Sequence, residues 1–422
     1  MTKKIKLMFD ATILANGTIK DIGRSGIYFT AYQIINRLIQ NDNFNISFYC
    51  NPEKQYFLSK VSEFRNIPVY PNKGFIGNML SYMKFKKKES HLKNNRIMKI
   101  YWHYIRFFTK IFIGFISVFE RKIKPFDYDI DIFFSPCEHC PNFLSAHHQI
   151  KKYTMIYDIT PLLHNNLFVD NEKCWQKRLV DYMAGNLKDM YFSISENTKK
   201  DFLKFIPQLN PQNIIVVPLA AGNNFKPCSK EDTTKSLNKY GLQLDKKYIF
   251  SLCSLAPHKN LIRAVKTFVQ FVEKHQINDL VFVLGGGHYN EFIDKLNAML
   301  GKIPEGLVIK AGYIDDEDLA PLYSGAEWFV YTSQYEGFGL PPLEAMQCGC
   351  PVITFNNSSL PEVVGDAGIM IDWDSDEQHI KAYEDYYFNP ELREQMRQRG
   401  LERAKQFSWD KTVDLMVKEM MK

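Results

Sequence analysis

Two glutamates and two glycines between residues 333 and 347 are the residues best suited to chemistry. The segment reads Ser-Gln-Tyr-Glu-Gly-Phe-Gly-Leu-Pro-Pro-Leu-Glu-Ala-Met-Gln, with Glu336 before the glycines and Glu344 after them. Glycine lets backbone N–H groups approach a ligand, and the positive end of a following helix attracts an anion such as phosphate. Carboxylates beside an anion site are suited to the hydroxyl groups of a sugar or ribose. Taken singly, Glu344 could instead complement the helix dipole, and Glu336 could be a solvated loop acid.

The flanking sequence predicts the elements that position this loop. An apolar strand over 328–331 leads into it. Residues 343–347 are predicted to start a helix that ends at Gly349 and carries Glu344 in its first turn, and 351–355 reads as a second buried strand. The loop is therefore expected at the carboxyl end of a strand.

The length of 422 residues exceeds one ordinary core and predicts two domains. A hydrophobic content of 45% and a charged content of 24% are typical of a soluble globular protein. Strands alternate with helices, which predicts an α/β fold with mostly parallel sheets. We expect strands at 6–9, 46–50, 130–134, 153–157, 190–194, 214–217, 248–252 and 281–284, and an early helix over 27–38.

Further loops at strand ends carry polar residues. Lys259 follows the strand over 248–252, where its ammonium could meet a diphosphate. Asn260 is predicted to cap a helix that starts at Leu261. Gly285-Gly286-Gly287-His288 superficially suggests a dinucleotide fold, but the sequence contains no G-x-G-x-x-G pattern, which argues against a dehydrogenase.

Taken together, residues 333–368 resemble the donor-site signature of retaining glycosyltransferases of the family 4 type. Glu-Gly-Phe-Gly-Leu-Pro and the later Leu-Pro-Glu-Val-Val-Gly-Asp-Ala-Gly both match that signature. The resemblance implies a GT-B fold: two Rossmann-like, doubly wound domains facing a central cleft, with a C-terminal helix crossing back to the first domain. It also implies that Glu336 holds sugar hydroxyls, that Glu344 holds a ribose, and that the N–H groups of Gly337, Phe338, Gly339 and Leu340 contact the donor.

Other segments resemble the same family and extend the expected site. The loop containing Gly26 matches the segment near the donor phosphates, and the segment around Tyr313 matches the one that holds the nucleobase. Asp158 is retained at a strand end that lines the cleft, although Tyr157 replaces the usual histidine. Lys259 is retained as well, but His258 replaces the usual arginine. Either His258 becomes protonated on donor binding, or Lys259 neutralises most of the phosphate charge. Ser195 is predicted to cap the helix begun by Glu196.

The expected domains are an acceptor-binding domain over 1–217, a nucleotide-sugar-binding domain over 218–405, and a helix over 406–422 that packs back on the first domain. Residues of about 80–124 form a basic and aromatic insertion, with twelve Lys and Arg between 84 and 124 against only Glu89 and Glu120. Such a pattern suits a helix on an anionic membrane surface. The alternative is a pair of core helices with a solvated basic face. No nucleic-acid module is recognisable elsewhere.

Eight scattered cysteines and the lack of a signal peptide predict a cytoplasmic location, with peripheral association at the inner face of the membrane. Cys137 and Cys140 form a single C-x-x-C, which we interpret as ordinary loop thiols. Asp127-Tyr128-Asp129 and Asp372-Trp373-Asp374 imitate a metal-binding Asp-x-Asp. We expect no metal and no cofactor, because lysine and helix ends can stabilise the charge.

The resemblance therefore implies a retaining hexosyltransferase that uses a nucleotide sugar and acts on a lipid-linked or polysaccharide acceptor. The Gly26 loop and the Lys259 segment resemble those of bacterial mannosyltransferases, which favours mannose from GDP-mannose as the donor. Two alternatives stay open: a nucleotide-sugar epimerase of the same fold, and a catalytically inactive partner subunit of a glycosyltransferase complex. Intact Glu336, Lys259 and Glu344 argue against an inactive subunit.

Overall fold

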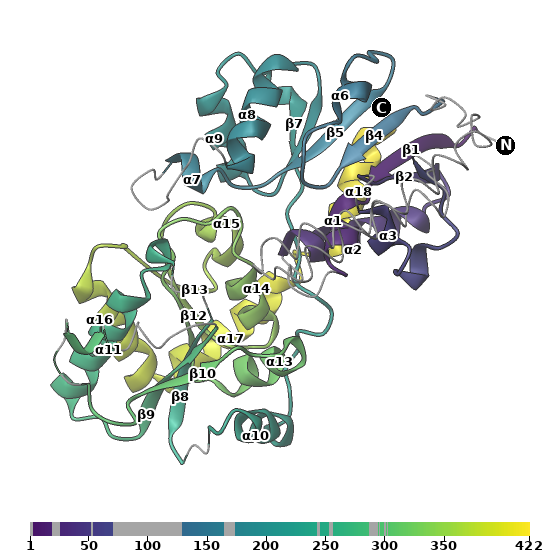
Figure 1. The fold of residues 1–422 in the computed structure, drawn as a ribbon. Coiled ribbons are helices and arrows are strands. Elements are labelled where there is room, and N and C mark those ends of the chain that lie inside the picture. Colours follow the sequence, from purple (N-terminus) through teal and green to yellow (C-terminus); the bar gives the residue numbers. More distant parts are fainter. Residues whose placement is uncertain are drawn as a thin grey trace, which may run out of the picture.

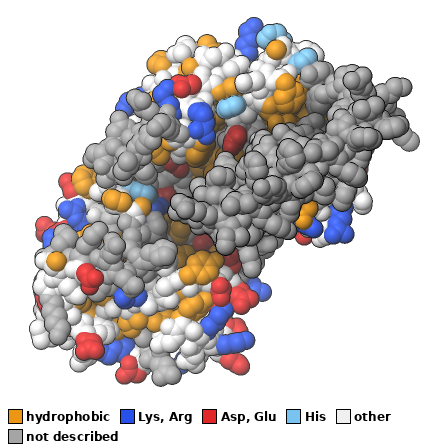
Figure 2. Space-filling model, viewed as in Figure 1, with side chains coloured by type: hydrophobic (Ala, Val, Ile, Leu, Met, Phe, Trp, Pro, Cys, Tyr) orange, Lys and Arg blue, Asp and Glu red, His pale blue; other side chains and the backbone are white. Residues whose placement is uncertain are grey.

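Two parallel β-sheets, one in each half of the chain, organise the computed structural model (Figure 1). The structure describes residues 3–18, 26–51, 54–70, 129–163, 174–242, 245–252, 256–286, 294, 296–298, 301 and 303–422. The basic and aromatic insertion of 84–124 and the glycine loop before Gly26 lie outside these residues. Figure 2 shows the same two lobes as a surface, with charged side chains of both signs interspersed on the described face of the C-terminal lobe.

The N-terminal sheet has seven strands within the described residues, in the spatial order β3-β2-β1-β4-β5-β6-β7. Its strands are β1 (Ile5–Asp10), β2 (Phe44–Tyr49), β3 (Val69–Tyr70), β4 (Ile132–Ser135), β5 (Lys151–Ile156), β6 (Met190–Ser193) and β7 (Ile214–Val216). The helical segments of this lobe are α1 (Thr12–Asn16), α2 (Gly26–Ile39), α3 (Gln55–Leu58), η1 (Ser62–Phe64), α6 (Asn142–Ser145), α7 (Thr160–Leu163), α8 (Trp175–Gly185), α9 (Glu196–Phe205) and η4 (Pro211–Asn213).

The C-terminal sheet has six strands within the described residues, in the order β10-β9-β8-β11-β12-β13. Its strands are β8 (Lys247–Leu252), β9 (Leu280–Gly285), β10 (Val308–Gly312), β11 (Phe329–Tyr331), β12 (Val352–Phe355) and β13 (Gly368–Ile371). The helical segments are α10 (Lys230–Lys239), η5 (Pro257–Lys259), α11 (Leu261–His275), α13 (Asp316–Gly325), α14 (Leu340–Gln347), α15 (Leu360–Val364), α16 (Asp376–Phe388), α17 (Pro390–Ala404) and α18 (Trp409–Met420).

Every strand pair is parallel, so the carboxyl ends of neighbouring strands meet at one edge of each sheet. Central strands such as β4 and β12 are buried along their whole length. Their sequences are near-continuous apolar runs because helices cover both faces of a parallel sheet. The predicted α/β fold of two doubly wound domains is confirmed.

The last helix, α18, returns to the N-terminal lobe and lies beside α2 (Figure 1). Asp410 accepts a hydrogen bond from the Arg37 guanidinium at 2.5 Å, and the Thr412 hydroxyl donates to the Pro218 carbonyl at 2.5 Å. The Tyr153 hydroxyl donates to the Glu419 carbonyl at 3.3 Å. The end of the chain is thus bonded to the first lobe by side chains and by backbone.

Acidic residues form the first turn of α13, which starts at Asp316. Two local predictions about the helices of the C-terminal lobe are wrong. The helix predicted to start at 343 starts at Leu340, since prolines are accepted in a first turn. Glu344 is therefore the fifth residue of α14, beyond its first turn. Asn260 does not cap α11; it adopts the left-handed conformation with φ 48°, which asparagine tolerates.

Candidate functional site

Residues 336–339 form the last part of the loop that joins β11 to α14. The carbonyl groups of residues 336–338 accept hydrogen bonds from the hydroxyl groups of neighbouring serines. The Ser359 hydroxyl lies 2.9 Å from the carbonyl oxygen of Glu336 and 2.6 Å from that of Phe338. The carbonyl of Gly337 lies 2.8 Å from the Ser195 hydroxyl, which comes from the other lobe. All three carbonyl groups therefore have hydroxyl partners.

A trans peptide points each N–H opposite the carbonyl of the preceding residue. The N–H groups of Gly337, Phe338 and Gly339 are thus directed away from those hydroxyls. Across the described ranges, no backbone hydrogen bond uses them. The N–H groups of Gly337 and Gly339 face away from Ser359, and that of Phe338 faces away from Ser195. Backbone N–H groups that make no such bond can contribute to an anion site.

Two glycines make this loop possible. A Cβ at Gly337 would lie 2.9 Å from the Cβ of Asp158 and 3.1 Å from a methyl group of Ile194, so no side chain fits between the lobes. Gly339 has φ 122°, a conformation that other residues rarely adopt, and a Cβ there would lie 3.0 Å from Leu360.

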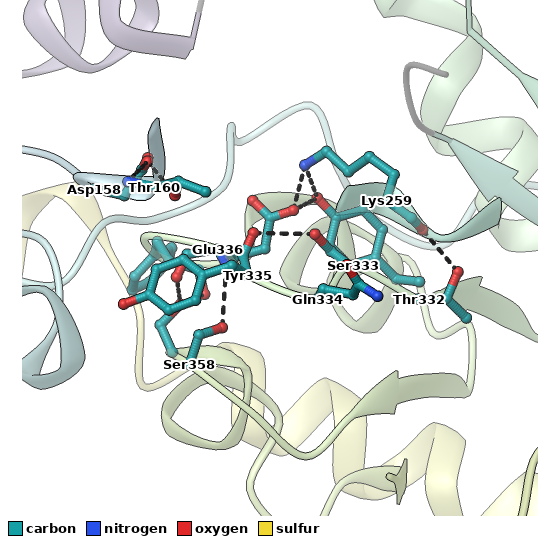
Figure 3. A network of polar contacts seen from close by, with 12 residues as sticks. Asp158, Thr160, Lys259, Thr332, Ser333, Gln334, Tyr335, Glu336 and Ser358 are labelled. Carbon is teal, nitrogen blue, oxygen red and sulfur yellow. Dashed lines mark hydrogen bonds and ion pairs between the residues drawn. The ribbon is translucent and has the colours of Figure 1, made fainter. Parts of the chain in front are cut away.

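Lys259 and Glu336 meet at the start of the loop (Figure 3). The Lys259 ammonium forms an ion pair with the Glu336 carboxylate and lies 3.2 Å from the Tyr331 hydroxyl, which itself donates to Glu336 at 2.6 Å. Both charged side chains are only 16% exposed. Burial raises the pKa of Glu336, but the charge and hydrogen bond of Lys259 outweigh it, so the pKa lies below its usual value.

Backbone contacts fix the two strand-end segments that carry this pair. The Thr332 hydroxyl donates to the Lys259 carbonyl at 3.0 Å, and the Gln334 N–H donates to the His258 carbonyl at 2.7 Å. His258 therefore lies next to Lys259 in the short helix η5, with its backbone held against the segment that precedes Glu336. The cluster can exchange the Lys259 ammonium between a carboxylate and an incoming anion.

Asp158 approaches the same loop from the N-terminal lobe. Its Oδ1 accepts hydrogen bonds from the Thr160 N–H at 3.1 Å and from the Thr160 hydroxyl at 2.5 Å (Figure 3). A Cβ at Gly337 would lie 3.1 Å from its other oxygen, Oδ2. Tyr157, which stands where a histidine was expected, is buried and donates to the Pro136 carbonyl at 2.9 Å.

Glu344 lies on the wall of a cavity of about 620 Å³ between the lobes. The wall also includes Gly26 and Phe29 of α2 and Asp316 of α13. Burial raises the pKa of Glu344 to about 7, with a further contribution from the charge of Asp316, although a hydrogen bond from Tyr323 opposes the rise. The Tyr323 hydroxyl donates to Glu344 at 3.2 Å. A half-buried carboxylate in a cavity of this size is suited to ligand hydroxyls.

Comparison with known proteins identifies the family. The model of the family described as "Glycosyl transferases group 1" matches residues 232–403. The O-antigen chain mannosyltransferase B of Escherichia coli is 33% identical over 281 residues, which cover 64% of this chain and 70% of that protein. The chain belongs to the group 1 glycosyltransferases.

More distant relatives agree with this family. The serotype-specific mannosyltransferase WbdA of Escherichia coli is 26% identical over 63% of this chain, which spans only 33% of that longer protein. The Anabaena HepE structure with UDP and glucose aligns over 99% of both chains, with a TM-score of 0.63 and 14% identity. WaaG, described as a glycosyltransferase of lipopolysaccharide biosynthesis, aligns over 99% of this chain with a TM-score of 0.60 and 13% identity. These neighbours establish the GT-B fold.

The structure places the remaining expected site residues of this glycosyltransferase as follows. Gly26 is the first residue of α2, and a Cβ there would meet nothing within 4 Å. Leu340 lines the cavity beside Glu344. Phe338 directs its ring away to Phe407, at 5.8 Å between centroids, so only its backbone can serve a donor. The Tyr313 side chain is 72% exposed and follows β10.

Sequence reasoning missed three groups that shape this glycosyltransferase site. Tyr331 was read only as the end of a strand, whereas its hydroxyl bonds to Glu336. Ser359 precedes the recognised Leu-Pro-Glu segment and holds two loop carbonyls. Ser195 caps α9 as predicted, accepting from the Thr198 N–H at 3.0 Å, and also contacts the Gly337 carbonyl. For Ser359 and Ser195, the available signal was a serine at the start of a helix next to the loop.

The Asp-x-Asp segments have ordinary partners where the structure describes them. Asp129 forms an ion pair with Lys6, and Asp372 accepts from the Gln378 amide at 2.9 Å. Among the described residues, no three or more His, Cys, Asp or Glu side chains are arranged to hold a metal ion. Burial raises the pKa of the Cys137 and Cys140 thiols to about 12, so both stay protonated near neutral pH. In the described part of the chain, no helix has the length and apolar character needed to cross a membrane.

Glu344 should make donor binding by this glycosyltransferase depend on pH. With a pKa of about 7, the carboxyl becomes protonated as the pH falls. If Glu344 holds a ribose, as the sequence resemblance implies, only its ionised form can accept hydrogen bonds from both ribose hydroxyls. We expect the affinity for a nucleotide sugar to fall between pH 8 and pH 6, approaching about tenfold per pH unit below the pKa. Titration calorimetry with the nucleotide sugar measures this dependence. Glu344→Gln, which cannot ionise, should flatten it; an unchanged slope in that variant would contradict the assignment.

Proposed function

We propose that this glycosyltransferase moves a hexose, with mannose from GDP-mannose as the first choice, to a lipid-linked or polysaccharide acceptor with retention of configuration. Residues 218–405 would bind the nucleotide sugar, residues 1–217 the acceptor, and 406–422 would brace the first domain. The observation that carries the proposal is the meeting of Lys259 with Glu336 beside three N–H groups that point away from their hydroxyl-bonded carbonyls.

The geometry supports a diphosphate at this point. The Lys259 ammonium is held by a carboxylate, which a phosphate can replace as its partner. The exchange frees the Glu336 carboxylate to accept hydrogen bonds from sugar hydroxyls. His258, next to Lys259, would add a second cation if its imidazole took up a proton from solvent when the negatively charged phosphate binds.

The choice of mannose rests on the relatives. The O-antigen chain mannosyltransferase B and WbdA of Escherichia coli both carry mannosyl transfer in their names. Glu344 would hold the ribose, and the backbone near Tyr313 the base.

The reaction we propose exchanges one bond for another at the anomeric carbon. Its bond to the β-phosphate oxygen breaks, and the pair of electrons leaves with the nucleoside diphosphate. Lys259 and the N–H groups of residues 337–339 stabilise that charge. The acceptor oxygen then bonds to the same face of the sugar, and its proton passes to an oxygen of the departing phosphate. Asp158, which contacts the loop from the acceptor lobe, would orient the sugar or acceptor.

We also propose that the enzyme works at the inner face of the cell membrane, needing neither metal nor cofactor. The basic and aromatic insertion over 84–124 would hold it there by charge and by shallow apolar contact. Lys259 and the loop N–H groups supply the positive electrostatics that other transferases draw from a metal.

Measuring the Tm of the purified protein with each of a panel of nucleoside diphosphates and nucleotide sugars tests this function. We expect the largest rise in Tm with GDP or GDP-mannose, because a ligand that binds only the folded state stabilises it. Mannose transfer to added polysaccharide should follow, which an epimerase would not catalyse. Equal shifts with all bases, or transfer from a UDP-sugar only, would overturn the choice of GDP-mannose.

A further inference from the structure

Helix α9 of the N-terminal lobe begins against a carboxylate of the C-terminal lobe. Glu362, in α15, accepts hydrogen bonds from the N–H groups of Glu196 at 2.8 Å and Asn197 at 2.7 Å. These N–H groups belong to the first turn, where a helix has unpaired donors and a positive end. Both oxygens of one carboxylate therefore bridge the two lobes.

The same end of α9 also contacts residues 336–339, which we call the donor loop. The hydroxyls of Ser195 and Thr198 lie 2.8 Å and 3.2 Å from the carbonyl oxygen of Gly337. Ser195 and Thr198 are buried. The orientation of the peptide between Gly337 and Phe338, and hence of its N–H, depends on the position of α9.

A third contact lies beside these two. Asn197 donates through its side chain to the Tyr335 hydroxyl at 2.8 Å, and that hydroxyl donates to Asp201. Tyr335 directly precedes Glu336. Helix α9 thus contacts the residue before Glu336 and the residue after it.

Within the C-terminal lobe, Arg403 of α17 fixes the helix that carries Glu362. Its guanidinium donates to the carbonyl of Val363 at 3.0 Å and to that of Glu362 at 2.5 Å. The short helix α15 is therefore bonded to its own lobe by backbone, leaving the Glu362 carboxylate for the other lobe. Figure 1 shows α15 at the edge of the C-terminal lobe that faces α9.

We infer that Glu362 is a positioning residue for glycosyl transfer: its bond to α9 keeps the lobes closed and presents Ser195 and Thr198 to the Gly337 carbonyl. We call Glu362, Ser195, Thr198, Tyr335 and Asp201 the interdomain latch. Through it, the N-terminal lobe sets the direction of a loop N–H without touching the donor. This inference rests on the donor site proposed above.

The latch affects transfer more than nucleotide binding. Lys259, Glu344 and the segment near Tyr313 all belong to the C-terminal lobe, so a nucleoside diphosphate keeps these partners when the lobes separate, and only the Phe338 N–H loses its orientation. The acceptor side of the reaction does not, because Asp158 and the remainder of the first lobe move away from Gly337.

The test compares Glu362→Ala and Glu362→Gln with Asp366→Asn as the control. Asp366 follows on the same segment, is exposed, and pairs with Arg399 at 3.6 Å. For each variant we would measure the radius of gyration of the ligand-free protein by small-angle X-ray scattering, the Kd for GDP, kcat and Tm.

We expect Glu362→Ala to enlarge the ligand-free protein and to lower kcat about tenfold or more, with the Kd for GDP raised by a smaller factor, since among the expected diphosphate partners only the Phe338 N–H changes direction. Glu362→Gln keeps an oxygen that accepts one N–H bond and should restore part of kcat. Asp366→Asn should behave as wild type. An unchanged radius of gyration in Glu362→Ala, or equal losses of kcat and GDP affinity that follow a fall in Tm, would overturn the latch.

The outcomes also separate this inference from the proposed donor site. If that site is wrong, Lys259 and Glu336 variants will keep wild-type nucleotide binding and transfer, whereas the scattering of Glu362→Ala will still change. If only the latch is wrong, the site variants will lose activity while Glu362→Ala stays compact and active.

Discussion

Replacing Lys259 by methionine lowers kcat/KM for the sugar nucleotide by about 10²–10³-fold in our account, the usual effect of losing one group that stabilises transition-state charge. Methionine fills much of the lysine volume but cannot bond to a phosphate. The Glu336 carboxylate, 16% exposed, also loses the cation that holds its pKa below the usual value. Steady-state transfer kinetics, together with the Kd for GDP, measure both effects.

Lys266→Met provides the matched control for Lys259. Lys266 lies on α11, just beyond Lys259, and forms an ion pair with Asp376, so the variant removes a comparable lysine pair. Its activity should stay close to wild type. Wild-type kcat/KM in Lys259→Met would show that the phosphate is stabilised elsewhere.

Replacing Glu336 by glutamine changes catalysis and nucleotide binding in opposite directions. Without its charge, the side chain holds sugar hydroxyls more weakly, and we expect kcat to fall by about 10²–10³-fold. Lys259, no longer held by a carboxylate, becomes more available to phosphate, so GDP should bind more tightly. Transfer assays and titration calorimetry on the same preparation measure the two effects.

Glu327→Gln is the corresponding control for Glu336. Glu327 pairs with Arg393 at 3.1 Å in the C-terminal lobe, outside the donor loop. If Glu336→Gln weakened GDP binding in step with kcat and lowered Tm, Glu336 would be supporting the loop rather than the sugar.

The sequence pattern was sufficient for the main elements of this site, because strands such as β8 and β12 are short apolar runs ending in polar or glycine-rich loops. Glycines that expose backbone N–H groups, next to the carboxylate of Glu336, predicted a site for phosphate and hydroxyl groups. Short or glycine-containing strands escaped prediction: β3 has two residues, and β13 starts at Gly368. Neither offers enough apolar positions for a periodic signal.

The pairing of Lys259 with Glu336 was beyond sequence reasoning. The two residues are 77 positions apart and follow β8 and β11, which become neighbours only through the crossover of the sheet. The sequence pattern assigned them to separate parts of the donor, whereas the structure joins them in an ion pair. The bond between Glu362 and α9 was equally inaccessible, since it depends on how two independently patterned lobes meet.

A crystal structure of the protein with GDP or a GDP-sugar tests the central claim most directly. We predict that the β-phosphate lies within hydrogen-bond distance of the Lys259 ammonium and of N–H groups among residues 337–339, with the Lys259–Glu336 ion pair broken. A diphosphate bound elsewhere while that ion pair persists would contradict the account.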